Sequence, residues 1–160
     1  PTNIINLCKR YIHLISIFLL ILLILNSYNL FLLDLFFYIL LHILFIYLIF
    51  FYDNKINYYT TFLIAFILDL YLVNNFGPHL IIFLLMFTII KKFKIFFNNK
   101  NPQYLIFANL IIIYIMLVLE TIIWIIFYDN SLNLYVLINY FIVLILIYYP
   151  SYFVLKLIKF

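Results

Sequence analysis

Long apolar stretches separated by short polar breaks limit the possible folds of this chain more than any other feature. Hydrophobic residues make up 71 % of the 160 residues and charged residues only 9 %, and the mean hydropathy is +1.29. A water-soluble domain carries far more charge on its surface. The sequence therefore predicts a single integral membrane domain over residues 1–160.

The polar breaks divide the chain into segments long enough to cross a bilayer, which takes about 20 apolar residues. The predicted spans are residues 11–26, 30–51, 57–74, 78–97, 103–128 and 133–155. Because the loops are short, we expect successive helices to pack as antiparallel neighbours. The predicted fold is an all-α, polytopic membrane bundle of six transmembrane helices.

The basic residues all fall on one side of this predicted topology. They are Lys9, Arg10, Lys55, Lys91, Lys92, Lys94, Lys100, Lys156 and Lys159. The loops on the other side carry no lysine or arginine. Because cytoplasmic loops are enriched in these two residues, we expect both termini to be cytoplasmic.

Three acidic residues, Asp34, Asp69 and Glu120, lie inside predicted spans and in the outer half of the membrane. An ionisable side chain at membrane depth is costly without a partner, so each marks a candidate functional site. One interpretation is a shared pocket that binds a small ligand or a partner's helix or loop. The alternative is that each acid is protonated or hydrogen-bonded, and only fixes helix packing or caps a helix end.

The turn that follows Asp69 favours a functional role for this acid. The segment Asn74-Asn75-Phe-Gly77-Pro78 contains the only glycine of the chain. Glycine tolerates a positive φ and proline is ill suited to continue a helix, so the span must end here and turn back. Asp34 lies at the start of its span, where the helix dipole favours a carboxylate. Glu120 has no evident partner nearby in the sequence.

The remaining polar residues do not form a pattern typical of an enzyme or a metal site. His13 and His42 appear isolated on apolar helices, and His79 follows the outer turn, where we expect it at the membrane interface. The sequence has no nucleophile paired with a base, no phosphate-binding glycine loop and no paired carboxylates on one helix face. We therefore predict a protein that is not an enzyme, needs no cofactor or metal and binds no nucleic acid.

Two segments carry a resemblance to a known family. The second span begins Leu33-Asp34-Leu-Phe-Phe-Tyr-Ile-Leu-Leu, and the third ends Leu68-Asp69-Leu with Gly77 eight positions after the acid, then His79-Leu80. Over roughly residues 30–95 this resembles the MreD family of rod-shape-determining membrane proteins of bacterial cell elongation. Leu33 stands where that family usually has proline, and the glycines that usually precede the second acid are missing.

The resemblance implies a non-enzymatic role in the bacterial cytoplasmic (inner) membrane, in lateral peptidoglycan synthesis and control of cell shape. The implied partners are MreC and, directly or through it, MreB, RodA and a class-B penicillin-binding transpeptidase. From the resemblance and the outer position of the acids, we expect a pocket that receives the transmembrane or juxtamembrane segment of MreC. Its predicted partner-binding residues are Asp34, Asp69, Gly77, Pro78, His79 and Glu120.

A second class of protein shares the same plan. Small, very hydrophobic six-helix proteins include the substrate-binding S components of energy-coupling-factor micronutrient transporters, which this chain also resembles. Those proteins use Ala-x-x-x-Ala patches to contact a coupling protein, whereas this chain has two alanines, Ala65 and Ala108, on different predicted helices. The short outer loops also leave little to close over a ligand.

Overall fold

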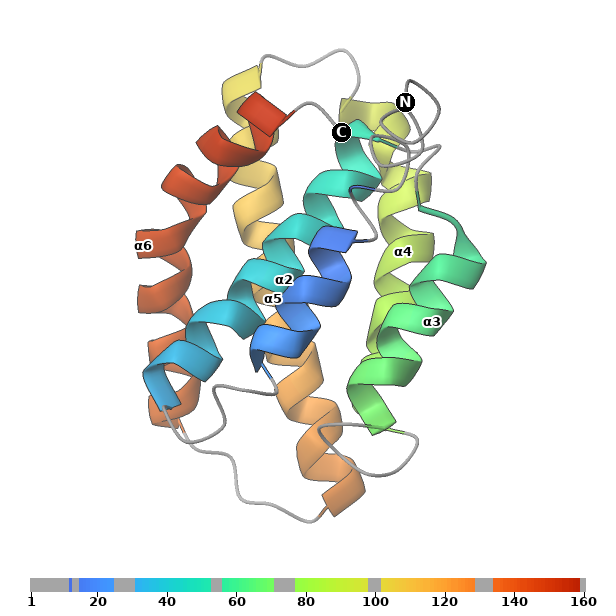
Figure 1. Cartoon of the computed structure of the whole chain (residues 1–160), viewed down its shortest axis with the longest axis vertical. Coiled ribbons are helices and arrows are strands. Elements are labelled where there is room, and N and C mark those ends of the chain that lie inside the picture. The colour runs from blue at the N-terminus through green and yellow to red at the C-terminus, as the bar shows by residue number, and fades with distance from the viewer. Residues whose placement is uncertain are drawn as a thin grey trace, which may run out of the picture.

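The computed structural model describes residues 12, 15–24, 31–52, 56–70, 77–97, 102–128 and 134–158, and their regular structure is entirely helical (Figure 1). The helices are Ile15–Ile24, α2 (Phe31–Phe51), α3 (Tyr58–Leu68), α4 (Pro78–Phe97), α5 (Pro102–Tyr128) and α6 (Leu134–Ile158). The predicted all-α bundle is confirmed.

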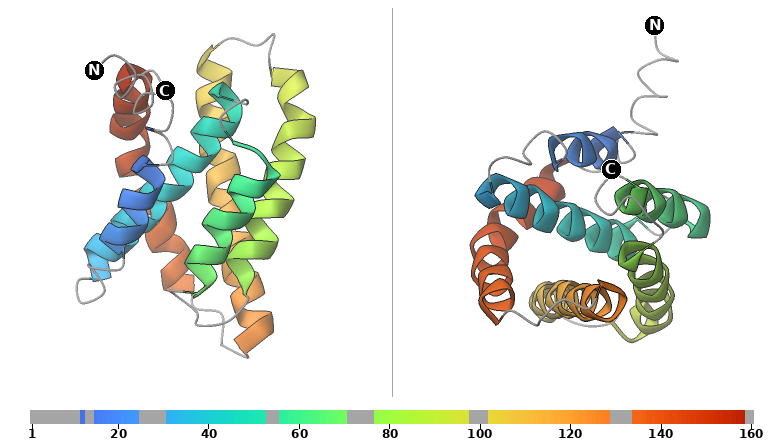
Figure 2. Two further views of the ribbon diagram at one scale, coloured as in Figure 1. Left: turned by 45° about the vertical axis from the view of Figure 1, so that its right-hand side comes forward. Right: turned by 90° about the horizontal axis from the view of Figure 1, so that it is seen from below.

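Successive helices run in alternating directions along the long axis of the molecule (Figures 1 and 2). Helix α2 crosses the centre of the bundle and packs against α4, α5 and α6, while α3 packs on α4. Helix Ile15–Ile24 lies against α2 on the side away from α5, as the view from below shows (Figure 2). α2 therefore holds the other helices together.

The central position of α2 explains its burial. Every residue from 41 to 50 is buried. Apart from His42, this segment is apolar on all sides. In contrast, only 22 % of the residues in the apolar segments of α5 and α6 are buried, whereas 67 % of those in the apolar segment of α2 are buried. A helix that is apolar all round is stable only in a protein core or in lipid. α2 has the first environment, and the outer faces of α5 and α6 require the second.

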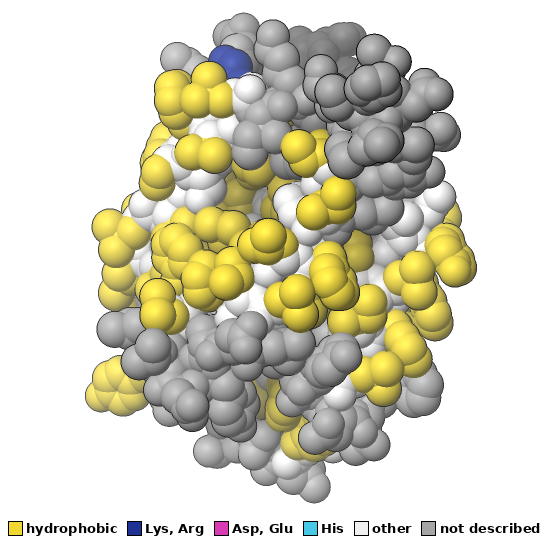
Figure 3. Space-filling view, in the orientation of Figure 1, with side chains coloured by type: hydrophobic (Ala, Val, Ile, Leu, Met, Phe, Trp, Pro, Cys, Tyr) yellow, Lys and Arg dark blue, Asp and Glu magenta, His cyan; other side chains and the backbone are white. Residues whose placement is uncertain are grey.

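The outer surface carries large apolar side chains across the middle of the molecule (Figure 3). Ile126 is 69 % exposed on α5 and Leu146 is 70 % exposed on α6. Exposed apolar surface this extensive marks contact with lipid or another protein. Three helical segments, Leu33–Phe51, Tyr104–Tyr128 and Leu134–Leu157, are long and apolar enough to cross a membrane. Together these features indicate a membrane protein.

The predicted third span, residues 57–74, differs from the helix in the structure. Asn57 caps α3 by accepting from the Thr60 amide at 2.9 Å, while the Thr60 hydroxyl accepts from the Asn57 amide at 2.9 Å. The α-helix ends at Leu68, so it is about 17 Å long, against about 30 Å for the hydrocarbon core. The residues from 71 to 76 lie outside the described part of the chain.

The described lysines lie at one end of the bundle, near the ends of α4 and α6. Lys94 donates from Nζ to the carbonyl oxygen of Ile49 at 3.3 Å, which satisfies one of the unpaired carbonyls at the end of α2. Lys91 Nζ lies 5.1 Å from the centre of the Phe87 ring. Lys156 occupies the last turn of α6. Atoms of a basic side chain are visible at the top of Figure 3, the end at which α6 finishes in Figure 1.

Candidate functional site: a buried polar network and the cavity beside it

The Asp69 carboxylate joins the end of α3 to the start of α4. Its Oδ2 accepts from the amides of Gly77 and Leu80, each at 3.0 Å, and its Oδ1 accepts from the amide of His79 at 3.1 Å. The Nδ1 of the His79 ring lies 2.8 Å from the same Oδ1. The first amides of a helix have no partner within it, and the helix dipole favours a negative charge there. Asp69 therefore caps α4 from a neighbouring helix.

This cap provides a structural reason for the eight positions between Asp69 and Gly77. The connection must return the chain from the end of α3 to the start of α4, within reach of one side chain. Asp69, Gly77, Pro78 and His79 are all buried, so an unpaired amide here would have no water to bond. The acid and the buried turn thus form one structural unit.

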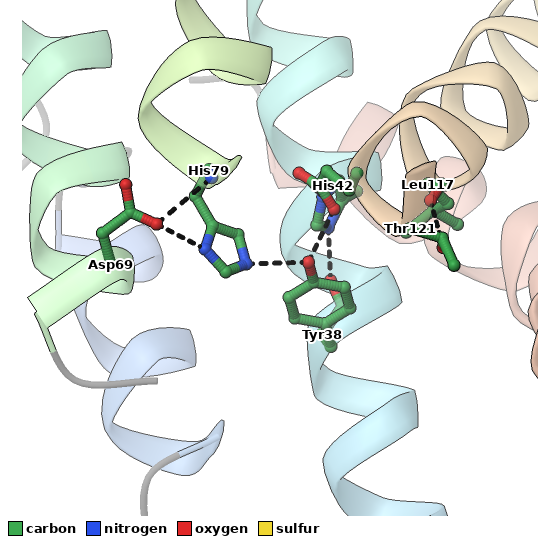
Figure 4. A network of polar contacts seen from close by, with 7 residues as sticks. Tyr38, His42, Asp69, His79, Leu117 and Thr121 are labelled. Carbon is green, nitrogen blue, oxygen red and sulfur yellow. Dashed lines mark hydrogen bonds and ion pairs between the residues drawn. The ribbon is translucent and has the colours of Figure 1, made fainter. Parts of the chain in front are cut away.

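The network continues from α4 through α2 to α5 (Figure 4). His79 Nε2 lies 2.9 Å from the Tyr38 hydroxyl, and this hydroxyl donates to Glu120 Oε2 at 2.6 Å. Glu120 is 3 % exposed and His79 is 2 % exposed. The Tyr38 hydroxyl is therefore the link between the two acids.

His42 completes the network on the other side of Glu120. Its Nε2 lies 3.0 Å from both carboxyl oxygens of Glu120, and its Nδ1 donates to the Tyr38 carbonyl oxygen, one turn earlier in α2, at 2.8 Å. The His42 side chain is fully buried. The contacts from Asp69 to His42 connect four helices, α3, α4, α2 and α5.

Each ionisable side chain of this network has a polar partner. Asp69 accepts from three backbone amides and lies beside His79 Nδ1. The Tyr38 hydroxyl donates to Glu120 and contacts His79 Nε2, and Glu120 also contacts His42 Nε2. Burial in an apolar bundle is costly for a polar group that lacks such partners.

On α2 and α5 the network lies well inside the helix ends. Glu120 precedes the last residue of α5, Tyr128, by about 12 Å along the helix, and Tyr38 follows the first residue of α2 by about 10 Å. On α3 and α4 it lies at the helix ends, with His79 about 18 Å from Lys91 along α4. The contacts of Tyr38 and Glu120 are thus at the depth of the apolar part of the bundle.

A cavity of about 230 Å³ opens beside the network. It is lined by Ile24, Asp34, Leu35, Tyr38, His79, Trp124 and Tyr140. Asp34 lies in the first turn of α2 and is partly exposed. Its side chain makes no ion pair or hydrogen bond with another described residue. Asp34 is therefore separate from the network, although both border the same cavity.

A second, larger hollow of about 470 Å³ lies between helix Ile15–Ile24, α2 and α6. Apart from Ser16 and Ser151, its lining is apolar, and it includes Pro150, which lies inside α6. It contains none of the acids or histidines described above. This hollow is not part of the polar site.

The structure brings the predicted site residues together only in part. Asp69 and Glu120 belong to one network through His79 and Tyr38, whereas Asp34 meets them only at the cavity. Asp69 caps a helix end, as the alternative interpretation predicted for the acids. The assignment of these residues to partner binding stays a prediction.

Two expectations about single residues are wrong. His42 is not isolated, since it contacts Glu120. Glu120, which has no partner nearby in the sequence, finds its partners on α2. His79 is buried, not interfacial, because the Asp69 cap draws the start of α4 into the bundle. The sequence contained one signal for this site, the helical spacing of Asp34, Tyr38 and His42. His13 lies outside the described residues.

Comparison with known protein families, with curated proteins and with solved structures finds no match for this chain. Within the described part of the chain, no group of three or more histidine, cysteine, aspartate or glutamate side chains could hold a metal ion. The functional inference therefore depends on the family resemblance and on the geometry of the network and cavity.

Proposed function

We propose that the chain crosses the bacterial cytoplasmic membrane six times, with both termini in the cytoplasm. The alternating helix directions and the lysines gathered at one end support this topology. The three lysines near the end of α4 shorten its apolar part. α4 can still cross the membrane, because a lysine near a helix end can extend its side chain so that the ammonium group reaches the interface. As described, α3 and helix Ile15–Ile24 are shorter than the hydrocarbon core is thick.

We propose that this protein is a non-enzymatic component of the cell-elongation machinery, similar to MreD, which binds MreC. Through MreC or directly it would act with MreB, RodA and a class-B penicillin-binding transpeptidase in lateral peptidoglycan synthesis. The observation that carries this proposal is the Asp69 cap. The acid-to-glycine spacing on which the resemblance rests has a defined structural role in this chain, which supports the proposal.

The contacts of the titratable residues support binding or architecture in preference to catalysis. Asp69, His79, Tyr38, Glu120 and His42 direct their polar atoms at one another or at backbone groups. A catalytic acid or base needs access to a substrate. In this site, the groups that meet the cavity are Asp34 and the edge of the network formed by Tyr38 and His79.

The size of the cavity favours a docking protein over a transporter subunit. Sites for small molecules usually enclose about 300–1,000 Å³. The cavity beside Asp34 encloses about 230 Å³, which suits part of a side chain better than a micronutrient. An S component should contain a larger polar cavity at this end of the bundle.

Co-purification tests the proposed function directly. The tagged chain is expressed with the MreC protein of the same organism, extracted in a mild detergent and isolated by its tag, with an unrelated six-span membrane protein as the control. We expect MreC to be retained by this chain and not by the control. Equal recovery with both proteins, or recovery with neither after cross-linking in cells, would overturn the proposal.

The transporter alternative makes a different prediction. Genes for coupling ATPases beside the coding region, or a micronutrient that co-purifies with the chain, would favour an S component. A neighbouring MreC-like gene would favour cell elongation. These observations separate the two functions without a mutation.

A further inference from the structure

Asp34 is the acid at the cavity that makes no ion pair with a described residue. The network behind it pairs its two acids with two histidines. Asp34 has no such partner among the described residues, although it is only partly exposed. A carboxylate in an apolar bundle is stable as an anion when a cation pairs with it. The cavity therefore holds a carboxyl group without an ion-pair partner among the described residues, with room beside it.

Aromatic rings form much of the remaining wall. Tyr38, Trp124 and Tyr140 line the cavity with Asp34 and come from three helices, α2, α5 and α6. The face of an aromatic ring attracts a cation, and tryptophan does so most strongly. A carboxylate surrounded by such rings is suited to an organic cation. It is poorly suited to an anion.

No described lysine of this chain can reach Asp34. Lys91, Lys92, Lys94 and Lys156 lie near the ends of α4 and α6, whereas the cavity lies near the starts of these helices. The full sequence has no lysine or arginine between Arg10 and Lys55, the stretch that contains Asp34. Among the described residues, no lysine is therefore placed to pair with this carboxyl group, which leaves it available to a cation from a partner.

We propose that the cavity binds a basic side chain, a guanidinium or an ammonium group, from a membrane segment of a partner protein. The cavity would hold about eight water volumes, enough for such a group and the end of its stem. The identity of the partner rests on the proposed function. The preference of the cavity for a cation does not, since it follows from Asp34 and the aromatic wall.

Trp124 makes this proposal measurable, because it is the only tryptophan of the chain and lines the cavity. The full chain in phosphatidylglycerol nanodiscs is titrated with ethylguanidinium chloride while tryptophan emission is recorded at constant ionic strength. Ethylurea, which is neutral and similar in shape, is the matched ligand control. We expect a saturable change in emission with ethylguanidinium and none with ethylurea.

Two variants test whether Asp34 is responsible. Asp34→Asn removes the carboxylate at the cavity, and Asp53→Asn removes the same charge from the segment between α2 and α3. We expect the apparent Kd for ethylguanidinium to rise at least about tenfold in Asp34→Asn and to stay unchanged in Asp53→Asn. An equal response of the two variants, or an equal response to ethylurea, would overturn the cation site. Circular dichroism of both variants verifies that the helices are retained.

Further measurements distinguish the sources of the cation. If the response is lost in nanodiscs that contain phosphatidylethanolamine, the occupant is a lipid ammonium group, and the partner side chain is ruled out.

If MreC is retained equally by the Asp34→Asn and Asp53→Asn variants, its basic side chain is not the occupant. We expect MreC to be retained less by Asp34→Asn. The titration contains no MreC, so it tests the cation site independently of the proposed function. If the chain responds to ethylguanidinium but does not retain MreC, only the proposed function is contradicted.

Discussion

Glu120 and His42 depend on each other, since neither side chain has access to bulk water. Replacing Glu120 with leucine leaves His42 Nε2 and the Tyr38 hydroxyl buried without their acceptor. Removing one partner of a buried ion pair costs about 3–5 kcal/mol. We expect Glu120→Leu to lower the free energy of unfolding by that amount, measured by denaturant unfolding in detergent micelles.

The neighbouring residue provides the control for this change. Thr121 is half-buried, and its hydroxyl donates to the Leu117 carbonyl of its own helix at 2.8 Å. Its hydrogen bond joins no second helix, so Thr121→Ala should cost less than about 1 kcal/mol. Similar losses for the two variants would show that the contact between Glu120 and His42 adds little to stability.

The Tyr38 hydroxyl allows a second test at the residue scale, because it joins the two halves of the network. Tyr38→Phe, Glu120→Gln and the double variant form a double-mutant cycle. Hydrogen bonds between membrane helices contribute about 0.6 kcal/mol on average and up to about 1.7. We expect a coupling energy near the upper value, since the bond is short and Glu120 also pairs with His42. Additive single effects would contradict a shared network.

At the scale of the helices, Asp69 determines where α4 begins and how it meets α3. Asp69→Leu would leave the buried amides of Gly77, His79 and Leu80 without an acceptor, at about 1–3 kcal/mol for each buried donor. Asp69→Asn keeps one acceptor oxygen, so it should lose less stability. We expect amide hydrogen exchange at these three positions to rise in the order native, Asn, Leu.

The other end of α3 offers a matched control. Asn57 caps the same helix at an exposed site, and its replacement with alanine should cost about 1 kcal/mol. Its effect on exchange should be confined to the first turn of α3. If Asn57→Ala exposed the start of α4 as strongly as Asp69→Leu, the cap between the helices would not explain the stability of α4.

The sequence predicted the helices well where hydropathy and helix length agree. α5 and α6 follow closely the predicted spans 103–128 and 133–155, because proline, asparagine or aspartate interrupts a long apolar segment at each boundary. α3 was the exception. Hydropathy continues through Leu70 and beyond, but the Asp69 carboxylate bonds to α4, and hydropathy does not account for such a contact between helices.

The candidate site was predictable in its acids but not in its connections. The sequence singled out Asp34, Asp69 and Glu120 because a charge in an apolar segment is costly. The partners of Glu120 lie 78 and 82 positions away, at His42 and Tyr38, so no local pattern contains them. The protonation of the network also depends on which atoms meet, which a sequence does not specify.

For the whole molecule, the alternating helices and the lysine-rich end lead to a definite prediction about topology. Green fluorescent protein is fluorescent in the bacterial cytoplasm, whereas alkaline phosphatase is active only outside it, where its disulfides form. We expect fluorescent fusions at both termini, and active phosphatase fusions after Asn75 or Asp129, within the segments that precede α4 and α6. Each fusion site should give a signal with one reporter only.

The topology test also bears on the docking proposal, because the acids lie at the end of the bundle away from the lysines. If both termini are cytoplasmic, the cavity beside Asp34 opens towards the periplasmic half of the membrane. A partner that crosses the membrane once could then place a basic side chain there, just inside the outer interface. If the two termini were on opposite sides, or phosphatase after Asp129 were inactive, the cavity would not face that half, and a partner could not reach Asp34 from the periplasmic side.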